Sequence, residues 1–264
     1  MNMIKKKLKK NIIDVGAFNG IDGLALALKN KDAMVNAFEA NKDLISSIKS
    51  LKYTIEKRIG KKIKNYKIHN LAISDSNRYS TFYIAKNPTV SSLNQFSKNI
   101  EKFWPGYKDS HCHTIKKYKV KTITLYKFCK DNMIDNISFL HTDTQGNDLK
   151  ILEGLGSMIS IVDNGLLEAS VSKKKSLYKK NHTVSEVKIF LKKHNFFIKK
   201  TESVHSSIRN EVNIFYINNK IDHKNMINNK YNSRYFKRLL NDQTYFKDDL
   251  KDFFIKLYNK ILDN

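Results

Sequence analysis

NIIDVGAFNGIDG, residues 11–23, decides the fold class of this 264-residue chain. An apolar run leads into glycines at Gly16, Gly20 and Gly23, and an Ala/Leu-rich segment follows. This order predicts a buried strand, a tight turn and a helix at the start of an α/β fold with a parallel sheet. The glycine spacing differs from the G-x-G-x-x-G of dinucleotide sites, and the Asp14 carboxylate would repel a pyrophosphate. A cofactor with positive charge and no phosphate therefore fits this turn better.

A second acidic residue supports that interpretation. Residues 33–39, AMVNAFE, predict the second strand, and Glu39 ends it. Glu39 lies roughly 20 residues after Gly16, where an acid binds ribose hydroxyls in such folds. Both ribose hydroxyls can donate, and a carboxylate can accept both. S-adenosylmethionine has a ribose, an ammonium and a sulfonium and no phosphate, so the residues favour it as the cofactor.

Short apolar runs alternate with helical patterns along the rest of the chain, which predicts a parallel sheet with crossover helices. Further strands are expected over 66–73, 120–125, 137–143 and 165–171, with an antiparallel pair over 196–204 and 211–218. Helices are expected over 21–29, 42–62, 126–132, 148–155 and 183–194, the last beginning with a TVSE capping box. Residues 78–85 alternate like a strand or hairpin, and 86–119 are expected to form an irregular insert that acts as a lid or binds the acceptor.

Several motifs occur in the order typical of one family: DVGAFNG at 14–20, FEAN at 38–41, NLAISD at 70–75, TITLYKFC at 122–129, FLHTDTQGNDLKILEG at 139–154 and LLEAS at 166–170. With them, roughly residues 11–218 resemble the FkbM-type S-adenosylmethionine-dependent methyltransferases. The resemblance implies a class I, Rossmann-like methyltransferase fold whose seven-stranded, mostly parallel sheet has the order 3-2-1-4-5-7-6, with helices on both faces. It also implies O-methylation of sugar or glycan hydroxyls. Within HTDTQGND, His141 stands where the family usually has lysine, and Asn147-Asp148 replace Ala-Glu.

The motifs place a cofactor site along the first three strands. Asp14 and Gly16 are expected at the methionine end of the cofactor, and Glu39 at the ribose. The resemblance implies that Asp75 reaches the adenine amino group; an ordinary turn acid is the alternative. The full set of predicted cofactor-binding residues is Asp14, Gly16, Ala17, Phe18, Asn19, Gly20, Glu39, Ala40, Ala72 and Asp75.

Methylation of a sugar hydroxyl needs a base, because the hydroxyl is a poor nucleophile near neutral pH. Asp143 ends a strand at the point where ligands bind in open α/β sheets, so it is the first candidate; a helix cap is the alternative. Alternation places His141 on the same face, where it is expected to orient Asp143, unless it is purely structural. Glu168 is a second candidate base or a packing residue. Gln145 and Asn147 suit sugar hydroxyls and would equally suit a turn.

The formal net charge of +24 suggests nucleic acid or an anionic surface as a partner. The lysines are spread along the chain among many Asn and Ile, so a compositional origin is favoured and polyanion binding stays open. Two alternatives to glycan methylation follow: a methyltransferase acting on RNA or another polyanion, and a non-catalytic binding module. The two cysteines form no zinc motif, the HCH run at 111–113 predicts a surface loop, and no obligatory metal is expected.

The chain divides into a methyltransferase domain over 1–218 and a basic amphipathic tail over 219–264. Apolar residues recur at helical spacing in the tail, which predicts a helix that docks on the domain, on a second copy or on a membrane surface. The basic N-terminal segment lacks a full apolar core of a signal peptide, and no apolar run reaches the length of a membrane span. A cytoplasmic location is therefore expected.

Overall fold

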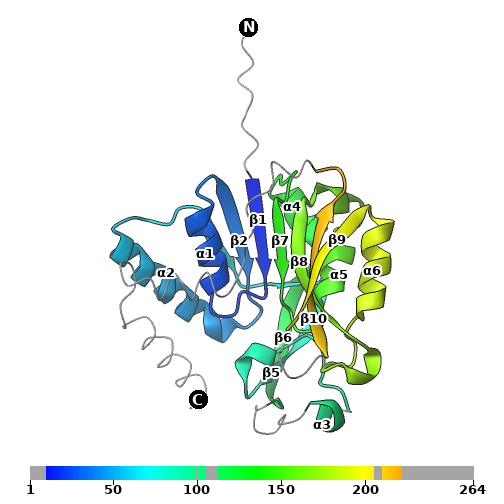
Figure 1. The fold of residues 1–264 in the computed structure, drawn as a ribbon. Coiled ribbons are helices and arrows are strands. Elements are labelled where there is room, and N and C mark those ends of the chain that lie inside the picture. The colour runs from blue at the N-terminus through cyan, green and yellow to red at the C-terminus, as the bar shows by residue number, and fades with distance from the viewer. Residues whose placement is uncertain (1–9, 99, 105–111, 205–209, 222–264) are drawn as a thin grey trace.

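The computed structural model describes residues 10–98, 100–104, 112–204 and 210–221. A seven-stranded sheet with the order β3-β2-β1-β7-β8-β10-β9 forms its centre (Figure 1). The strands are β1 (Lys10–Val15), β2 (Ala33–Phe38), β3 (Tyr66–His69), β7 (Phe139–Thr142), β8 (Asn164–Ser170), β9 (Phe196–Ser203) and β10 (Glu211–Asn218). Strand β10 runs antiparallel to the other six strands of this sheet. Numbered along the chain, the order is 3-2-1-4-5-7-6, which confirms the expected fold class.

Helices cover both faces of this sheet because its central strands are apolar on both sides. Ile13 and Leu140 pack into a core formed with α4 (Leu125–Asp131), α5 (Asp148–Glu153) and α6 (Val184–Lys193). Their neighbours Ile12 and Phe139 pack on the other face, against α1 (Ile21–Lys29) and α2 (Ile45–Ile59). The predicted capping box is present, since the Thr183 hydroxyl accepts a hydrogen bond from the backbone N–H of Glu186 and the Glu186 carboxylate accepts one from that of Thr183.

A second sheet of three strands lies beyond the carboxyl ends of the parallel strands (Figure 1). It contains β4 (Ala72–Ile73), β6 (Thr114–Ile123) and β5 (Arg78–Ala85), in the order β4-β6-β5. The prediction of one strand over 66–73 is wrong, because the chain turns at residues 70–71 and passes from the large sheet to the small one. The Asn70 side chain braces this turn by donating to the backbone oxygen of Glu39.

The prediction of an irregular insert over 86–119 is also wrong at its end. Residues 114–119 belong to β6, which pairs along its length with β5. The remainder holds the short helices η2 (Pro88–Val90) and α3 (Ile100–Phe103). The predicted helix over 42–62 begins with a 3₁₀ turn, η1 (Lys42–Leu44), and ends at Gly60, whose φ of 64° stops the helix.

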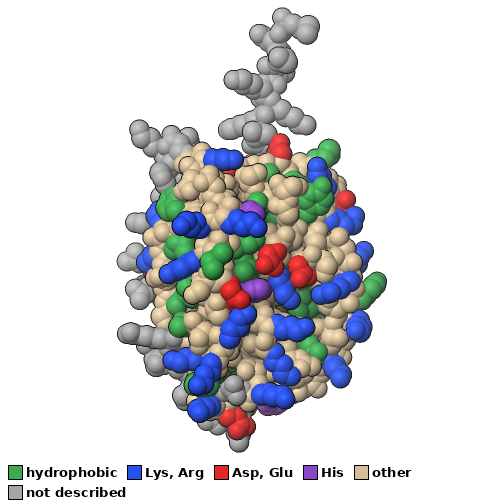
Figure 2. Space-filling model, turned by 90° about the vertical axis from the view of Figure 1, so that its right-hand side faces the viewer, with side chains coloured by type: hydrophobic (Ala, Val, Ile, Leu, Met, Phe, Trp, Pro, Cys, Tyr) green, Lys and Arg blue, Asp and Glu red, His purple; other side chains and the backbone are tan. Residues whose placement is uncertain are grey.

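Positive charge is scattered over the side of the molecule that carries α6 and β9. Figure 2 shows Lys and Arg side chains spread across this face, with a few acidic and histidine side chains among them. Within the described ranges, no helix is long and apolar enough to cross a membrane. Nearly all of the predicted tail, residues 222–264, and the basic N-terminal residues 1–9 lie outside the described residues.

Candidate active site

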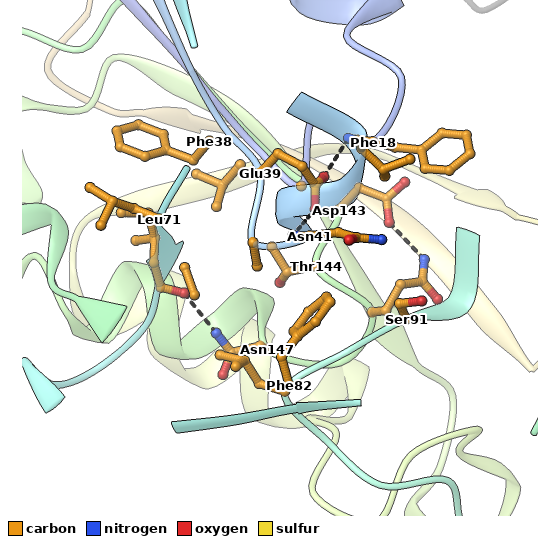
Figure 3. A pocket seen from close by; sticks show the side chains of 18 of the residues that line it. Phe18, Phe38, Glu39, Asn41, Leu71, Phe82, Ser91, Asp143, Thr144 and Asn147 are labelled. Carbon is orange, nitrogen blue, oxygen red and sulfur yellow. Dashed lines mark hydrogen bonds between the residues drawn. The ribbon is translucent and has the colours of Figure 1, made fainter. Parts of the chain in front are cut away.

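The carboxyl ends of β1, β2 and β7 border a cavity, which we call the Glu39 cavity (Figure 3). The Glu39 carboxylate is held by two backbone N–H groups, those of Phe18 at 2.7 Å and Asn41 at 2.6 Å. Burial raises the pKa of Glu39 to about 7, against the effect of these two hydrogen bonds. Each carboxylate oxygen has a second lone pair, so the fixed group can still accept hydrogen bonds from a ligand.

The walls of the Glu39 cavity differ from end to end. Figure 3 shows Phe38 and Leu71 on one side of Glu39, and Phe18 and Asp143 on the other. An apolar wall, the Glu39 carboxylate and a second carboxylate thus follow one another. This order suits a nucleoside whose base packs on the apolar side and whose positively charged substituent lies toward Asp143.

Gly16 lets the loops after β1 and β7 touch. Its φ is +88°, and a Cβ added there would lie 1.9 Å from the backbone oxygen of Asp143. The same two loops are tied by the Asp143 N–H, which donates to the Val15 oxygen at 2.9 Å. No side chain fits at this position, so glycine is needed for the loops after β1 and β7 to approach this closely at the wall of the cavity.

A second and larger cavity, of about 580 Å³, lies beside the first; we call it the Glu168 cavity. The two cavities share part of their walls, so ligands bound in each would meet there. The shared residues are Gly16, Phe18, Thr89, Asp143 and Gln145.

The Glu168 cavity is acidic although the chain is strongly basic. Asp22, Asp143, Glu168 and Glu211 line it, and none of the described residues in its walls is Lys or Arg. Glu168 and Glu211 are hydrogen-bonded to each other, and burial is the main cause that raises the pKa of both, to about 7 for Glu211. The pair therefore holds a shared proton near neutral pH.

Sequence reasoning missed Glu211, which is 3% exposed. It starts β10, two residues from Asn213, the residue paired with Glu168 in the antiparallel ladder. The expected strand order, which places the seventh strand beside the fifth, already implied that these two strands are neighbours. The register that brings the two carboxyl groups together was not predicted.

His141 pairs with Asp14 and not with Asp143, which corrects the expected arrangement. Its Nδ1 lies 2.8 Å from Asp14 Oδ1, and Asp14 is 1% exposed. Burial works to lower the pKa of His141, but the hydrogen bond and charge of Asp14 outweigh it and raise that pKa to about 9. Asp14 lines neither cavity, because its other oxygen lies under α1 against Gly23. Its expected place at the methionine end is therefore not what the structure shows.

Asp143 is exposed, and a chain of hydrogen bonds fixes its orientation. Gln145 Nε2 donates to Asp143 Oδ1 at 2.8 Å. The buried Tyr178 hydroxyl lies 2.9 Å from Gln145 Oε1 and 2.8 Å from the Val90 backbone oxygen, so these two acceptors share its one proton. Gln145 has a φ of 57°, an uncommon conformation for a residue with a side chain. Sequence reasoning selected Asp143 and Gln145 but missed Tyr178, which carries no motif of its own.

Most of the other predicted residues line one or both cavities: Ala17, Asn19, His141 and Glu168 line the Glu168 cavity, Glu39, Ala40, Ala72 and Asn147 line the Glu39 cavity, and Gly16, Phe18, Asp143 and Gln145 line both. Gly20 lines neither and instead caps α1. Asp75 also lines neither; it accepts from the hydroxyl of Ser76 at 3.0 Å and lies 3.8 Å from Arg78, so its role at adenine stays a prediction.

Asn147 is already committed to the fold. Its amide nitrogen donates to the Ile73 oxygen at 3.0 Å, and its amide oxygen accepts from the Ser74 hydroxyl at 3.2 Å. These bonds join the loop after β7 to β4, so Asn147 braces the fold, and its role at the acceptor stays a prediction. Among the residues that the structure describes, no group of three or more His, Cys, Asp or Glu could hold a metal ion. Cys112 lines the Glu168 cavity, and His111 of the HCH run is outside the described residues.

Comparison with known proteins identifies the family of this chain. The family model for the methyltransferase FkbM domain matches residues 14–198. Similar solved structures include the methyltransferase FkbM from Methylobacillus flagellatus KT, with 13% identity over 79% of this chain and 43% of that chain, and a TM-score of 0.49. TrmK from M. capricolum, solved with S-adenosyl-homocysteine, has 16% identity over 96% of this chain and 91% of that chain, with a TM-score of 0.43. The magnesium protoporphyrin IX methyltransferase of Synechocystis PCC 6803, solved with bound SAM, has 8% identity over 80% and 72%, with a TM-score of 0.41.

This chain spans less than half of the length of the M. flagellatus protein. No curated protein matches the chain significantly. The family model, in contrast, covers the chain from the end of β1 into β9 and includes every strand that borders the Glu39 cavity. The chain belongs to the FkbM methyltransferase family and has the Rossmann-like methyltransferase fold of that family.

Proposed function

We propose that this protein transfers a methyl group from S-adenosylmethionine to a hydroxyl of a sugar, polysaccharide or glycoconjugate, in a cytoplasmic step of polysaccharide synthesis. The observation that carries the proposal is the meeting of two cavities at one exposed carboxylate, Asp143. A cofactor in the Glu39 cavity and an acceptor in the Glu168 cavity would approach each other only at the shared wall. Alignment of two reactants is the main contribution a protein makes to such a displacement.

The residues of the Glu39 cavity fit this cofactor. Glu39 offers a fixed carboxylate to both ribose hydroxyls, and the aromatic and aliphatic wall with Phe38 and Leu71 suits the adenine. When bound, the cofactor supplies a methyl group on a positively charged sulfur, which leaves as a neutral thioether. Gly16 keeps the wall free of a side chain at the point where the two cavities join.

Asp143 would take the proton of the attacking hydroxyl while the new oxygen–carbon bond forms and the sulfur–carbon bond breaks. Gln145 and Tyr178 hold the carboxylate in one orientation, so it needs little reorganisation during the reaction. A positioned base of this kind contributes roughly 10²- to 10⁴-fold.

The charge of the Glu168 cavity favours a neutral, hydroxyl-rich acceptor over a polyanion. Carboxyl groups accept hydrogen bonds from hydroxyls, whereas phosphates placed beside Glu168, Glu211 and Asp143 would be repelled. The acidic cavity therefore argues against RNA as the acceptor, although the net charge of the chain favours RNA binding.

Two measurements test the proposal. Isothermal titration with S-adenosylhomocysteine should show binding to the wild type and weaker binding to Glu39→Ala; absent binding, or equal binding by both proteins, would overturn the cofactor assignment. Incubation with labelled S-adenosylmethionine and a panel of neutral glycans, lipopolysaccharide fragments and RNA should label the glycans. Labelling of RNA alone supports the polyanion alternative, and cofactor binding without any transfer supports a non-catalytic module.

A further inference from the structure

The outer face of the small sheet carries a ladder of lysines. In the β5–β6 pair, Tyr79 lies opposite Lys121, Thr81 opposite Lys119 and Tyr83 opposite Lys117. Directly opposed residues of an antiparallel pair point to the same face, and alternate residues of a strand do so too. These six side chains therefore share one face, which we call the lysine face. The intervening residues Phe82, Ile84 and Val120 are buried on the inner side.

The three lysines of this face are exposed and not neutralised. Within the part of the chain that the structure describes, the side chains of Lys117, Lys119 and Lys121 have no acidic partner and make no hydrogen bond. Lys116, which directly precedes Lys117 in the sequence, has its Nζ 4.0 Å from Asp43 Oδ2 instead. Alternate residues on a strand are about 7 Å apart, so the face presents a row of three positive charges over about 14 Å.

An exposed aromatic side chain lies at one end of this row. Tyr79, opposite Lys121, is 71% exposed. Ile115 is 53% exposed near the other end, at the register shift of the β5–β6 pair, where strand alternation does not assign it to this face. An aromatic or aliphatic side chain next to lysines is the combination that rests at a lipid headgroup region, with the ring or aliphatic group toward the acyl chains.

We propose that the lysine face docks the protein on an anionic lipid bilayer. Lysines near an anionic leaflet are attracted to it, and a flat two-stranded face can bring all three to the surface together. Single-stranded RNA fits this face less well, because RNA needs several free aromatic rings for successive bases. Tyr79 meets that need, whereas Tyr83 is half-buried and its hydroxyl accepts a hydrogen bond from Gln95 at 3.0 Å.

The lysine face leads toward the candidate active site. Tyr83 exchanges backbone hydrogen bonds with Ser92, whose hydroxyl donates to the Gln145 backbone oxygen at 2.6 Å. The helix η2 lies between these two residues in the sequence and contributes to the walls of both cavities. Resting on the proposed function, this placement would set a lipid-carried glycan beside the acceptor cavity. The docking itself does not depend on that function.

Sedimentation with vesicles tests the docking directly and needs no cofactor. Full-length protein is mixed with vesicles of phosphatidylcholine alone or with 30% phosphatidylglycerol. The test variant carries Lys117→Gln, Lys119→Gln and Lys121→Gln. The control carries Lys188→Gln, Lys192→Gln and Lys199→Gln, which removes the same charge from exposed positions on α6 and β9.

We expect binding to the anionic vesicles only, and loss of binding as salt rises. Each lysine near such a surface contributes roughly fivefold, so the test variant should bind roughly 100-fold more weakly, while the control stays within about threefold of wild type. Circular dichroism and thermal melting confirm that both variants fold. The single variant Tyr79→Ser should bind the vesicles more weakly than the wild type, with the same salt dependence, because it removes an apolar contact and no charge.

Three results would overturn the proposal: equal binding to both kinds of vesicle, equal losses in the two triple variants, or no vesicle binding by the wild type. A single-stranded RNA 12-mer serves as the competing ligand. If the wild type binds it and not the vesicles, and only the test variant loses it, the face is a nucleic-acid surface. Because no methyl transfer is measured, failure here is distinct from failure of the proposed function.

Discussion

Binding of S-adenosylhomocysteine should weaken as the pH falls through about 7, and Glu39 should be the reason. The ribose hydroxyls donate to the carboxylate, so the ionised form of Glu39 is the binding form. Burial raises the pKa of this group to about 7, so it is ionised above that pH and becomes protonated below it. Affinity for S-adenosylhomocysteine therefore rises with pH. If a positively charged side chain were the binding group, affinity would fall as that group lost its proton.

The size of the effect follows from the ionised fraction. Between pH 8 and pH 6 that fraction falls from about nine-tenths to about one-tenth, so the Kd should rise about tenfold. Glu39→Gln removes the charged acceptor, and a hydrogen bond to a charged group is worth about 1.5–3 kcal/mol. The variant should therefore bind about 10- to 150-fold more weakly at pH 8 and show no pH dependence.

Isothermal titration at pH 6, 7 and 8 measures both effects. Methylthioadenosine is the matched control ligand, because it keeps the ribose and has neither the amine nor the carboxylate of the amino-acid part. Its Kd should change with pH in the same proportion. A flat wild-type profile, or a Glu39→Gln protein that still follows the pH, would refute the assignment of the ribose to this carboxylate.

Three further predictions follow. Asp143→Asn should lower kcat roughly 10²- to 10⁴-fold in a methyl-transfer assay while the Kd for S-adenosylhomocysteine stays within about threefold; an unchanged kcat rules Asp143 out as the base. Gly16→Ala should lower the free energy of unfolding in urea by more than about 3 kcal/mol, whereas Gly60→Ala, with a similar positive φ and nothing within 4 Å of the added Cβ, should cost about 1–2 kcal/mol; equal costs would contradict the close approach to Asp143. The His141 pKa is raised to about 9, so the stabilisation from the His141–Asp14 pair should be complete below pH 6.5 and be lost as the pH rises through 9. The loss should be about 3 kcal/mol in the free energy of unfolding, measured against the Asp14→Asn, His141→Gln double variant. Parallel curves of stability against pH for the two proteins would disprove it.

The large sheet could be predicted because its strands are buried on both faces. Their apolar runs are continuous, so existence and order of the strands followed from pattern and from the family resemblance. Strand β6 could not be predicted over its first half, since the small sheet buries only one face and lysines fill the other. Residues 114–119 are TIKKYK, so the hydrophobic signal there reduces to Tyr118 and to Ile115, which is exposed.

The candidate site divides in the same way. Glu39 and Asp143 were predictable because each follows a strand that the pattern identifies, and strand ends meet at one edge of a parallel sheet. The His141–Asp14 pair was not, because it depends on the register between β1 and β7, which places these two residues directly opposite each other. The Glu168–Glu211 pair depends on the antiparallel register of β8 and β10 for the same reason. A single sequence gives neither register.

The register between β1 and β7 changes the reason why the site should prefer a cationic cofactor. Asp14 suggested it from the sequence, but Asp14 is buried and its charge is balanced by a His141 whose pKa is raised to about 9. The negative charge available to a ligand comes instead from Glu39 and from the exposed Asp143, which borders both cavities. A sulfonium next to Asp143 gains from that charge, and a neutral thioether does not. Asp143→Asn should therefore weaken S-adenosylmethionine more than S-adenosylhomocysteine, and equal effects on the two Kd values would place the reactive sulfur away from Asp143.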